Sequence, residues 1–309
     1  MGSEWSVKFD REGEPGKEIN MDKHFQWGGY DIYIPAAYVC AEGLVLDLCT
    51  EIDREVERRF LEKWVPRIRE GLSKQESQQL QRENPLAFHF YCDLWINGEQ
   101  LKNWHGSSSH WIPQELRPEE EHSHGGAEDY LDHYGLEKER VWVFQRIYYG
   151  WTDGVCEFQS IKAQLRSGYR EFPGECFQMP EIGASIVIPN PLTGQSHTLT
   201  VEDVQRQSVS IPERFAEYDM PSEATAMIFR LEPDIPSAEF QLKDTQERDQ
   251  ARKKDGTPYN SGTVGLMLRM PNDGTHVAVS SMRFKAPETV IWEPVFRKKT
   301  AEDVTVTLL

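Results

Sequence analysis

A two-residue alternation of side-chain types constrains the fold of this chain more than any other feature. In the clearest case, between residues 86 and 96, every second residue is apolar: Phe88, Phe90, Cys92 and Leu94. Successive side chains of a strand point to opposite faces of a sheet, so this pattern predicts a strand with one buried face. Asn97-Gly98 follows directly and predicts a two-residue hairpin turn.

Similar runs of apolar and β-branched residues predict roughly ten strands along the chain. The other expected strands are 32–34, 38–50, 141–149, 158–165, 185–188, 197–209, 225–231, 263–270, 276–284, 290–296 and 304–309. Turns at 190–194 and 272–274 predict two further hairpins. Many short strands favour a mainly β fold of β-sandwich-like antiparallel sheets, with an α+β fold as the alternative.

Helical spacing is confined to the N-terminal part of the sequence. Asp53 is expected to cap a helix that carries Trp64 and ends before Pro66. A second helix is expected from residue 73 to residue 82, where Ser73 and Glu76 fit a capping box. A short helical segment around residues 130–131 is expected to close at 135.

Length and element order predict the domain organisation. A chain of 309 residues can form one large domain or two ordinary ones. Because the helices come first, we expect an α+β part over residues 1–135 and an all-β part over 136–309, with a single interlocked domain as the alternative. Residues 1–30 are polar and rich in Gly, which is typical of a partly mobile segment. Residues 106–126 and 245–262 are expected to form long loops.

The charge balance restricts the classes of partner. The chain has 34 Lys and Arg residues against 51 Asp and Glu residues, a formal net charge of -17. Such an excess of negative charge repels nucleic-acid backbones and anionic membrane surfaces. Without a long apolar run, a signal-peptide pattern or a C-x-x-C motif among its 5 Cys residues, the sequence indicates a soluble, cytoplasmic protein with reduced thiols.

Histidines provide one candidate site. His105, His110, His122 and His124 lie in or beside the expected loop at 106–126, with Glu121 among them. Imidazole and carboxylate groups are good ligands for zinc and other divalent ions. A divalent metal is therefore possible as a cofactor, with Glu121 as the base of a metal-dependent hydrolase; the alternative is a solvated polar loop.

Tryptophans provide a second candidate site. Trp95, Trp104 and Trp111 flank the His-rich loop and could stack on sugars or other flat ligands. The alternative is packing between sheets, since strands favour aromatic residues. Asp47 and Glu51 share one strand face about 13 Å apart, too far for a glycosidase pair, and we expect a strand end that emerges into solvent.

Three segments carry a resemblance to a family. They are Asn190-Pro-Leu-Thr-Gly with His197-Thr-Leu-Thr-Val, Tyr38-Val-Cys-Ala-Glu-Gly-Leu-Val-Leu-Asp-Leu-Cys, and the C-terminal stretch that includes His276-Val-Ala-Val-Ser-Ser-Met-Arg-Phe and Trp292-Glu-Pro-Val-Phe-Arg-Lys-Lys. Together they resemble an uncharacterised family of cytoplasmic proteins from anaerobic bacteria. The resemblance implies a bacterial protein and carries no assigned activity.

The leading hypothesis is a binding or interaction protein for a carbohydrate-like ligand or a protein partner, with its site within residues 95–124. No nucleophile elbow, Walker loop or dinucleotide fingerprint occurs in the sequence. The metal-dependent hydrolase is the alternative, and a structural subunit that pairs through sheet edges is a third. The sequence leaves the oligomeric state open.

Overall fold

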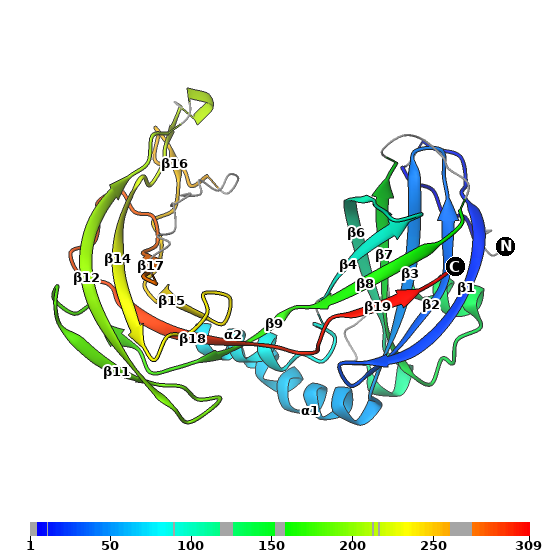
Figure 1. Ribbon diagram of the computed structural model, residues 1–309, viewed down its shortest axis with the longest axis horizontal. Coiled ribbons are helices and arrows are strands. Elements are labelled where there is room, and N and C mark those ends of the chain that lie inside the picture. The colour runs from blue at the N-terminus through cyan, green and yellow to red at the C-terminus, as the bar shows by residue number, and fades with distance from the viewer. Residues whose placement is uncertain are drawn as a thin grey trace. The chain divides into compact units, whose positions relative to one another are not determined.

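The computed structural model describes residues 5–10, 12–88, 90–117, 126–151, 158–211, 213–215, 217–259 and 274–309 (Figure 1). The side chains described exclude those of Lys74, Gln75, Gln78, Asn103, Trp104 and Arg214. The chain divides into two compact units, residues 1–168 with 299–309, and residues 169–298. It passes from one to the other after Gly168 rather than near Gly135, because strands between these residues pair with strands that precede Gly135.

The first unit contains two antiparallel sheets. The five-stranded sheet has the order β1 (Lys17–Trp27), β2 (Tyr30–Val39), β3 (Gly43–Ile52), β7 (Val141–Gly150) and β6 (Lys102–Trp111). The four-stranded sheet has the order β19 (Val304–Thr307), β8 (Ile161–Ser167), β4 (Phe90–Ile96) and β5 (Glu99–Gln100). The mainly β, sandwich-like fold predicted from the alternation is therefore confirmed.

One hydrophobic core joins the two sheets of the first unit. Leu44, Leu46 and Leu48 of β3 share a buried cluster with Leu94 and Ile96 of β4. Burying a leucine side chain stabilises the fold by about 1.5–3 kcal/mol, so these strand faces fix the register. Residues at the intervening positions of both strands consequently point away from this core.

The opposite face of the five-stranded sheet carries further apolar clusters. Val45 of β3 packs there with Val7 and Phe9 of the N-terminal segment. Cys49, farther along β3, packs with Leu131 of α3 (Ala127–Tyr134). The expectation of a partly mobile segment over residues 1–30 is wrong for β1 and for the buried residues before it.

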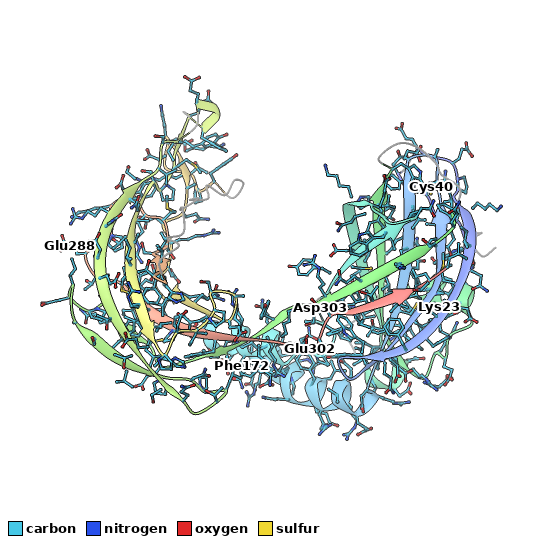
Figure 2. The ribbon with its side chains drawn as sticks, in the orientation of Figure 1. Lys23, Cys40, Phe172, Glu288, Glu302 and Asp303 are labelled. Carbon is cyan, nitrogen blue, oxygen red and sulfur yellow. The ribbon has the colours of Figure 1, made fainter. Side chains whose placement is uncertain are left out.

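Polar contacts hold the ends of these elements. The Trp27 indole of β1 donates a hydrogen bond of 2.6 Å to the carbonyl of Glu302. Glu302 and Asp303 directly precede β19 (Figure 2). The hairpin of β4 and β5 turns at Asn97 and Gly98, whose φ angles are 52° and 92°. Both angles are positive, as a type I′ turn requires, and the predicted hairpin is confirmed.

Helix α1 (Arg54–Glu70) begins as predicted, with the Asp53 side chain accepting hydrogen bonds from two backbone amides. It runs through Pro66 and ends at Gly71, so the expected end before Pro66 is wrong. Although Pro66 gives up one helical hydrogen bond, the buried Trp64 anchors the helix, and its indole donates to Glu83 at 2.9 Å.

Capping residues predicted the start of the second helix and the end of the third. Helix α2 (Lys74–Glu83) opens with the predicted capping box of Ser73 and Glu76. Helix α3 closes at Gly135, which has a φ of 64°. In the part of the chain that the structure describes, no helix is long and apolar enough to span a bilayer.

The second unit is also built from antiparallel strands. One sheet has the order β11 (Ser185–Pro189), β12 (Ser196–Ser208), β14 (Glu223–Glu232) and β17 (His276–Val279). Another joins β10 (Phe177–Gln178), β18 (Ile291–Lys299) and β15 (Phe240–Asp244), with β9 (Tyr169–Pro173) also on β18, and β13 (Tyr218–Asp219) pairs with β16 (Arg252–Lys253). The β11–β12 hairpin confirms its prediction, whereas the strand expected at 263–270 lies outside the described residues.

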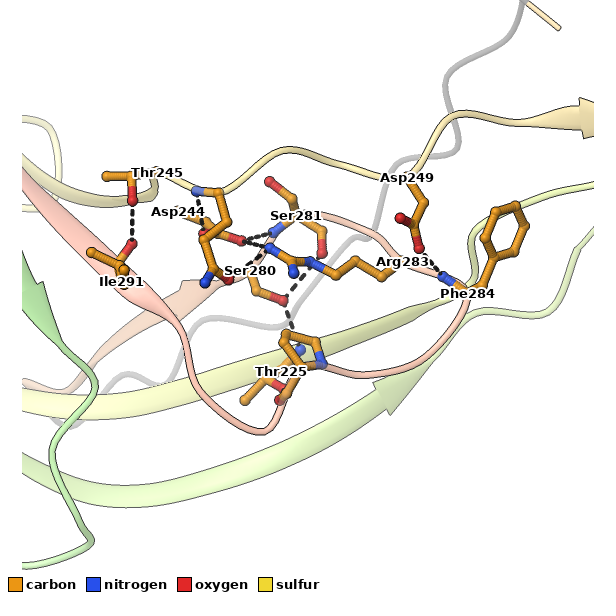
Figure 3. A network of polar contacts seen from close by, with 11 residues as sticks. Thr225, Asp244, Thr245, Asp249, Ser280, Ser281, Arg283, Phe284 and Ile291 are labelled. Carbon is orange, nitrogen blue, oxygen red and sulfur yellow. Dashed lines mark hydrogen bonds and ion pairs between the residues drawn. The ribbon is translucent and has the colours of Figure 1, made fainter. Parts of the chain in front are cut away.

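A buried carboxylate organises one loop of the second unit. Asp244 has a side chain only 2% exposed, and it accepts hydrogen bonds from the Ser281 amide at 2.9 Å and from Arg283 at 3.3 Å (Figure 3). Nearby, Asp249 accepts one from the Phe284 amide at 2.7 Å. These contacts tie the chain after β15 to residues 280–284, which is a structural role.

The loop expected at 106–126 is partly wrong. Strand β6 includes residues 106–111 and pairs with β7 along its length, and a short 3₁₀ turn, η1 (Gln114–Leu116), follows. The serines at 107–109 have little strand propensity of their own. Pairing with the apolar β7 decides their conformation, as tertiary context often does for strands. A second 3₁₀ turn, η2 (Glu213–Phe215), lies in the second unit.

Candidate functional site

The structure separates the two predicted histidine ligands that it describes. His105 and His110 both lie on β6, and their odd spacing places them on opposite faces of the sheet. His105 stacks on Tyr148 at a ring distance of 3.9 Å, whereas His110 lies opposite Val143. These two imidazoles therefore cannot share one ion.

The rest of the predicted metal site, His122, His124 and Glu121, lies outside the described residues. Within the described residues, no group of three or more His, Cys, Asp or Glu side chains is placed to hold a metal ion. The metal-dependent hydrolase stays a prediction.

The two predicted tryptophans whose side chains are described do not converge on one surface. Trp95 of β4 points away from the core shared by the sheets, since its neighbours Leu94 and Ile96 point into it. Trp111 packs on the far face of the five-stranded sheet, is 8% exposed, and donates to the Lys138 carbonyl at 2.9 Å. The side chain of Trp104 lies outside the described part of the structure.

An ion pair that the sequence did not predict lies on that same face. Asp47 of β3 is fully buried, so the expectation that it emerges into solvent is wrong. Its two carboxylate oxygens each accept a hydrogen bond of 2.7 Å from Arg146 of β7, through Nε and Nη2. The register places the two residues directly opposite one another. The sequence places opposite charges within two apolar strands, which could have indicated an ion pair. Only the pairing of β3 with β7 shows that these two residues face one another.

A chain of phenolic hydroxyls supports the carboxylate. Tyr134 donates to Asp47 at 2.6 Å, and its hydroxyl lies 2.7 Å from that of Tyr38. Because Tyr134 has one proton and gives it to Asp47, Tyr38 is the donor in the second bond. Tyr38 in turn accepts from the Trp5 indole at 2.9 Å. The hydrogen bonds thus run in one direction towards Asp47.

Burial shapes the protonation of this cluster. It raises the pKa of Tyr134 and of Tyr38 above the usual value near 10, and the negative charge of Asp47 adds to the effect. Burial alone would lower the pKa of Arg146, but the hydrogen bonds and charge of Asp47 outweigh it and raise that pKa. The phenols therefore stay protonated and Arg146 stays charged at neutral pH.

Arg146 also borders a pocket of about 800 Å³ in the first unit. The pocket is lined from the N-terminal segment, from the turn before β3, and from β6, β7 and the residue after β7: Ser6, Lys8, Phe9, Asp10, Glu42, His105, Arg146, Tyr148, Gly150 and Trp151. Its volume lies within the roughly 300–1,000 Å³ typical of small-molecule sites. Of the predicted site residues whose side chains the structure describes, only His105 lines it.

The N-terminal segment forms one wall of the pocket because its side chains alternate. Val7 and Phe9 are buried against the sheet, whereas Ser6, Lys8 and Asp10 are exposed on the pocket side. A glycine of β3 makes this packing possible. A Cβ on residue 43 would lie 2.2 Å from the Phe9 ring and 2.2 Å from a β7 carbonyl. The N-terminal segment therefore packs into a space that any side chain at position 43 would fill.

Rings and hydrogen bonds fix the remaining walls. The Trp151 indole donates to the carbonyl of Cys40 at 3.0 Å, which holds this ring at the pocket. Phe9 meets the Tyr148 ring edge-on at 5.8 Å, and Tyr148 carries His105 stacked on its face. Arg146 lies with its guanidinium carbon 4.9 Å from the centre of the Trp5 ring. The pocket thus combines preformed aromatic surface with a few placed polar groups.

Comparison with protein-family models, with curated proteins and with solved structures finds no match for this chain.

Proposed function

We propose that this protein binds a carbohydrate-like small molecule in the pocket beside Arg146. The observation that carries the proposal is the pocket itself, which is lined by the rings of Phe9, Tyr148 and Trp151 together with polar groups of both charge signs. Sugars present apolar C–H faces and hydroxyl edges, so they pair with aromatic rings and with charged donors and acceptors at once.

The polar groups at the pocket suit a ligand with many hydroxyls. Lys8 and Arg146 supply donors, while Asp10 and Glu42 supply carboxylate acceptors. A hydroxyl group can both donate and accept, and it can therefore satisfy either kind of partner. An apolar ligand would leave these groups without partners, which costs binding free energy.

We further infer a cytoplasmic and bacterial location. The described cysteines Cys40, Cys49, Cys92 and Cys176 are free thiols, as is usual in a reducing compartment. The resemblance of three sequence segments to cytoplasmic proteins of anaerobic bacteria supports the same inference.

Calorimetric titration with a panel of sugars tests the binding function. The panel contains the methyl glycosides of glucose, galactose and mannose with their disaccharides, and we expect saturable binding of at least one. His105→Ala removes an exposed ring that lines the pocket and should weaken that binding about two- to tenfold, since ring contacts of this kind contribute about 0.5–1.5 kcal/mol.

The matched control is His110→Ala on the opposite face of the same strand, which should leave the affinity unchanged. Absence of binding to every sugar of the panel would refute the proposal. Equal losses in the two histidine variants would show that the ligand binds elsewhere.

A further inference from the structure

The positive charge of Arg146 at the pocket is already compensated by the Asp47 carboxylate before any ligand binds. Asp47 binds Arg146 through two parallel hydrogen bonds of 2.7 Å and is 0% exposed, whereas Arg146 is 13% exposed. A ligand therefore meets only the arginine. An anionic ligand that approaches Arg146 would also approach the Asp47 carboxylate, because only the guanidinium group lies between the ligand and that carboxylate. Because the Asp47 and Arg146 side chains are themselves largely buried, water screens them little, and the repulsion from Asp47 offsets much of the attraction to Arg146.

The other charges at the pocket act in the same direction. Lys8 is a cation, but Asp10 and Glu42 are carboxylates that line the same space. With Asp47 included, three carboxylates face two cations among the described residues of the site. The chain as a whole carries a formal charge of -17, which also repels anions at longer range.

We infer that the pocket selects neutral sugars over their acidic counterparts, and that Asp47 is the residue that sets this preference. The inference rests on the proposed sugar-binding function and adds to it the charge class of the ligand. Asp47 does not touch the ligand; it is a positioning residue that acts through Arg146. It holds the guanidinium plane in place and cancels its charge, so that Arg146 serves as a hydrogen-bond donor to hydroxyls rather than as an anion receptor.

The hydroxyl chain behind Asp47 is consistent with this role. Tyr134 donates to Oδ2 of Asp47, the oxygen that also accepts from Nη2 of Arg146, and Tyr38 donates to Tyr134. Burial keeps both phenols protonated as donors. These hydrogen bonds hold the Asp47 carboxylate in place against the guanidinium group. The selectivity requires a carboxylate in that fixed position.

The test compares matched ligands on the full-length protein. Binding of the methyl glycosides of glucose, galactose and mannose is measured beside that of the three corresponding methyl uronides, which differ only in a carboxylate at C6. We expect the neutral member of the best-bound pair to bind at least tenfold more tightly, a free-energy difference of about 1.4 kcal/mol. A uronide that binds as tightly as its neutral partner would overturn the inference and leave the sugar-binding function standing. No binding of either class would overturn both.

Two variants then separate the role of Asp47 from a general effect. Asp47→Asn keeps the shape and removes the charge, so the neutral-to-acidic preference should fall at least tenfold, which loss of fold alone would not produce. Should Asp47→Asn fail to fold, Glu42→Gln at the exposed rim carries the test and should reduce the preference about threefold, the size of an exposed charge contact. The matched control is Glu99→Gln on the four-stranded sheet, which should leave the preference unchanged. An unchanged preference in Asp47→Asn would refute the role of Asp47. Where that variant does not fold, an unchanged preference in Glu42→Gln would refute the electrostatic origin of the preference, on which the role of Asp47 depends.

Discussion

Replacing Asp47 by Asn should destabilise the first unit far more than the same change at a surface ion pair. The variant leaves the Arg146 guanidinium, only 13% exposed, without its anionic partner. Breaking a buried ion pair from one side costs about 3–5 kcal/mol, because the remaining charge stays buried and uncompensated. Asparagine also replaces one of the two carboxylate oxygens by an amide donor, so at least one of the contacts made by Arg146 and Tyr134 must be lost.

A matched pair in the same unit provides the comparison. Asp93 of β4 accepts from Arg166 of β8 at 2.6 Å, but these side chains are 21% and 45% exposed. Water screens such a pair, so Asp93→Asn should cost less than about 1 kcal/mol. The two variants differ in burial of the pair and share the chemistry of the substitution.

Urea unfolding at pH 7, followed by circular dichroism, measures both losses. A double variant, Asp47→Leu with Arg146→Met, should recover most of the stability lost in Asp47→Asn, because apolar replacement of a buried pair is often neutral. Similar losses for Asp47→Asn and Asp93→Asn would refute the reasoning, since they would mean that Arg146 reaches water once Asp47 is gone.

Two further predictions concern protonation and packing. Burial raises the pKa of Tyr134 in the folded protein above its unfolded value of 10. As the pH rises, the unfolded chain therefore loses this proton first. The contribution of Tyr134 to stability is complete below pH 10, and the free energy of unfolding should then fall by up to about 1.4 kcal/mol per pH unit. Urea midpoints between pH 8 and 11 should therefore fall less steeply in Tyr134→Phe than in the parent protein, and parallel profiles would contradict the assignment. Trp111→Ala should lower stability by about 3–5 kcal/mol in the same urea assay, because the ring is 8% exposed and packs against α3 and β7; a loss below about 1 kcal/mol would mean that the ring is not part of the core.

Local sequence signals predicted the elements that depend on neighbouring residues. The positive φ angles of Asn97 and Gly98 and the cap at Asp53 arise within a few residues of chain, and each was predictable from residue type. The alternation that predicted β4 also reports its burial correctly, because Leu94 and its even-numbered neighbours fill the core between the sheets.

Long-range pairing decided what the sequence could not indicate. Residues 107–109 are serines, and only their alignment with β7 makes them part of a strand. Asp47 resembles a solvent-facing residue until Arg146, ninety-nine positions later, is placed opposite it. The pocket was the hardest feature to predict from the sequence. One of its walls is an N-terminal segment with a polar sequence, and this segment packs on the sheet only because Gly43 has no side chain.

The central claim is that a sugar occupies the pocket beside Arg146, and hydrogen–deuterium exchange with and without the best-bound sugar tests it most directly. The account predicts slower exchange confined to the segments that line the pocket, which are residues 6–10, residues 146–151 and the chain next to Glu42 and His105. Protection that appears instead around Trp95, or in residues 169–298, would contradict it.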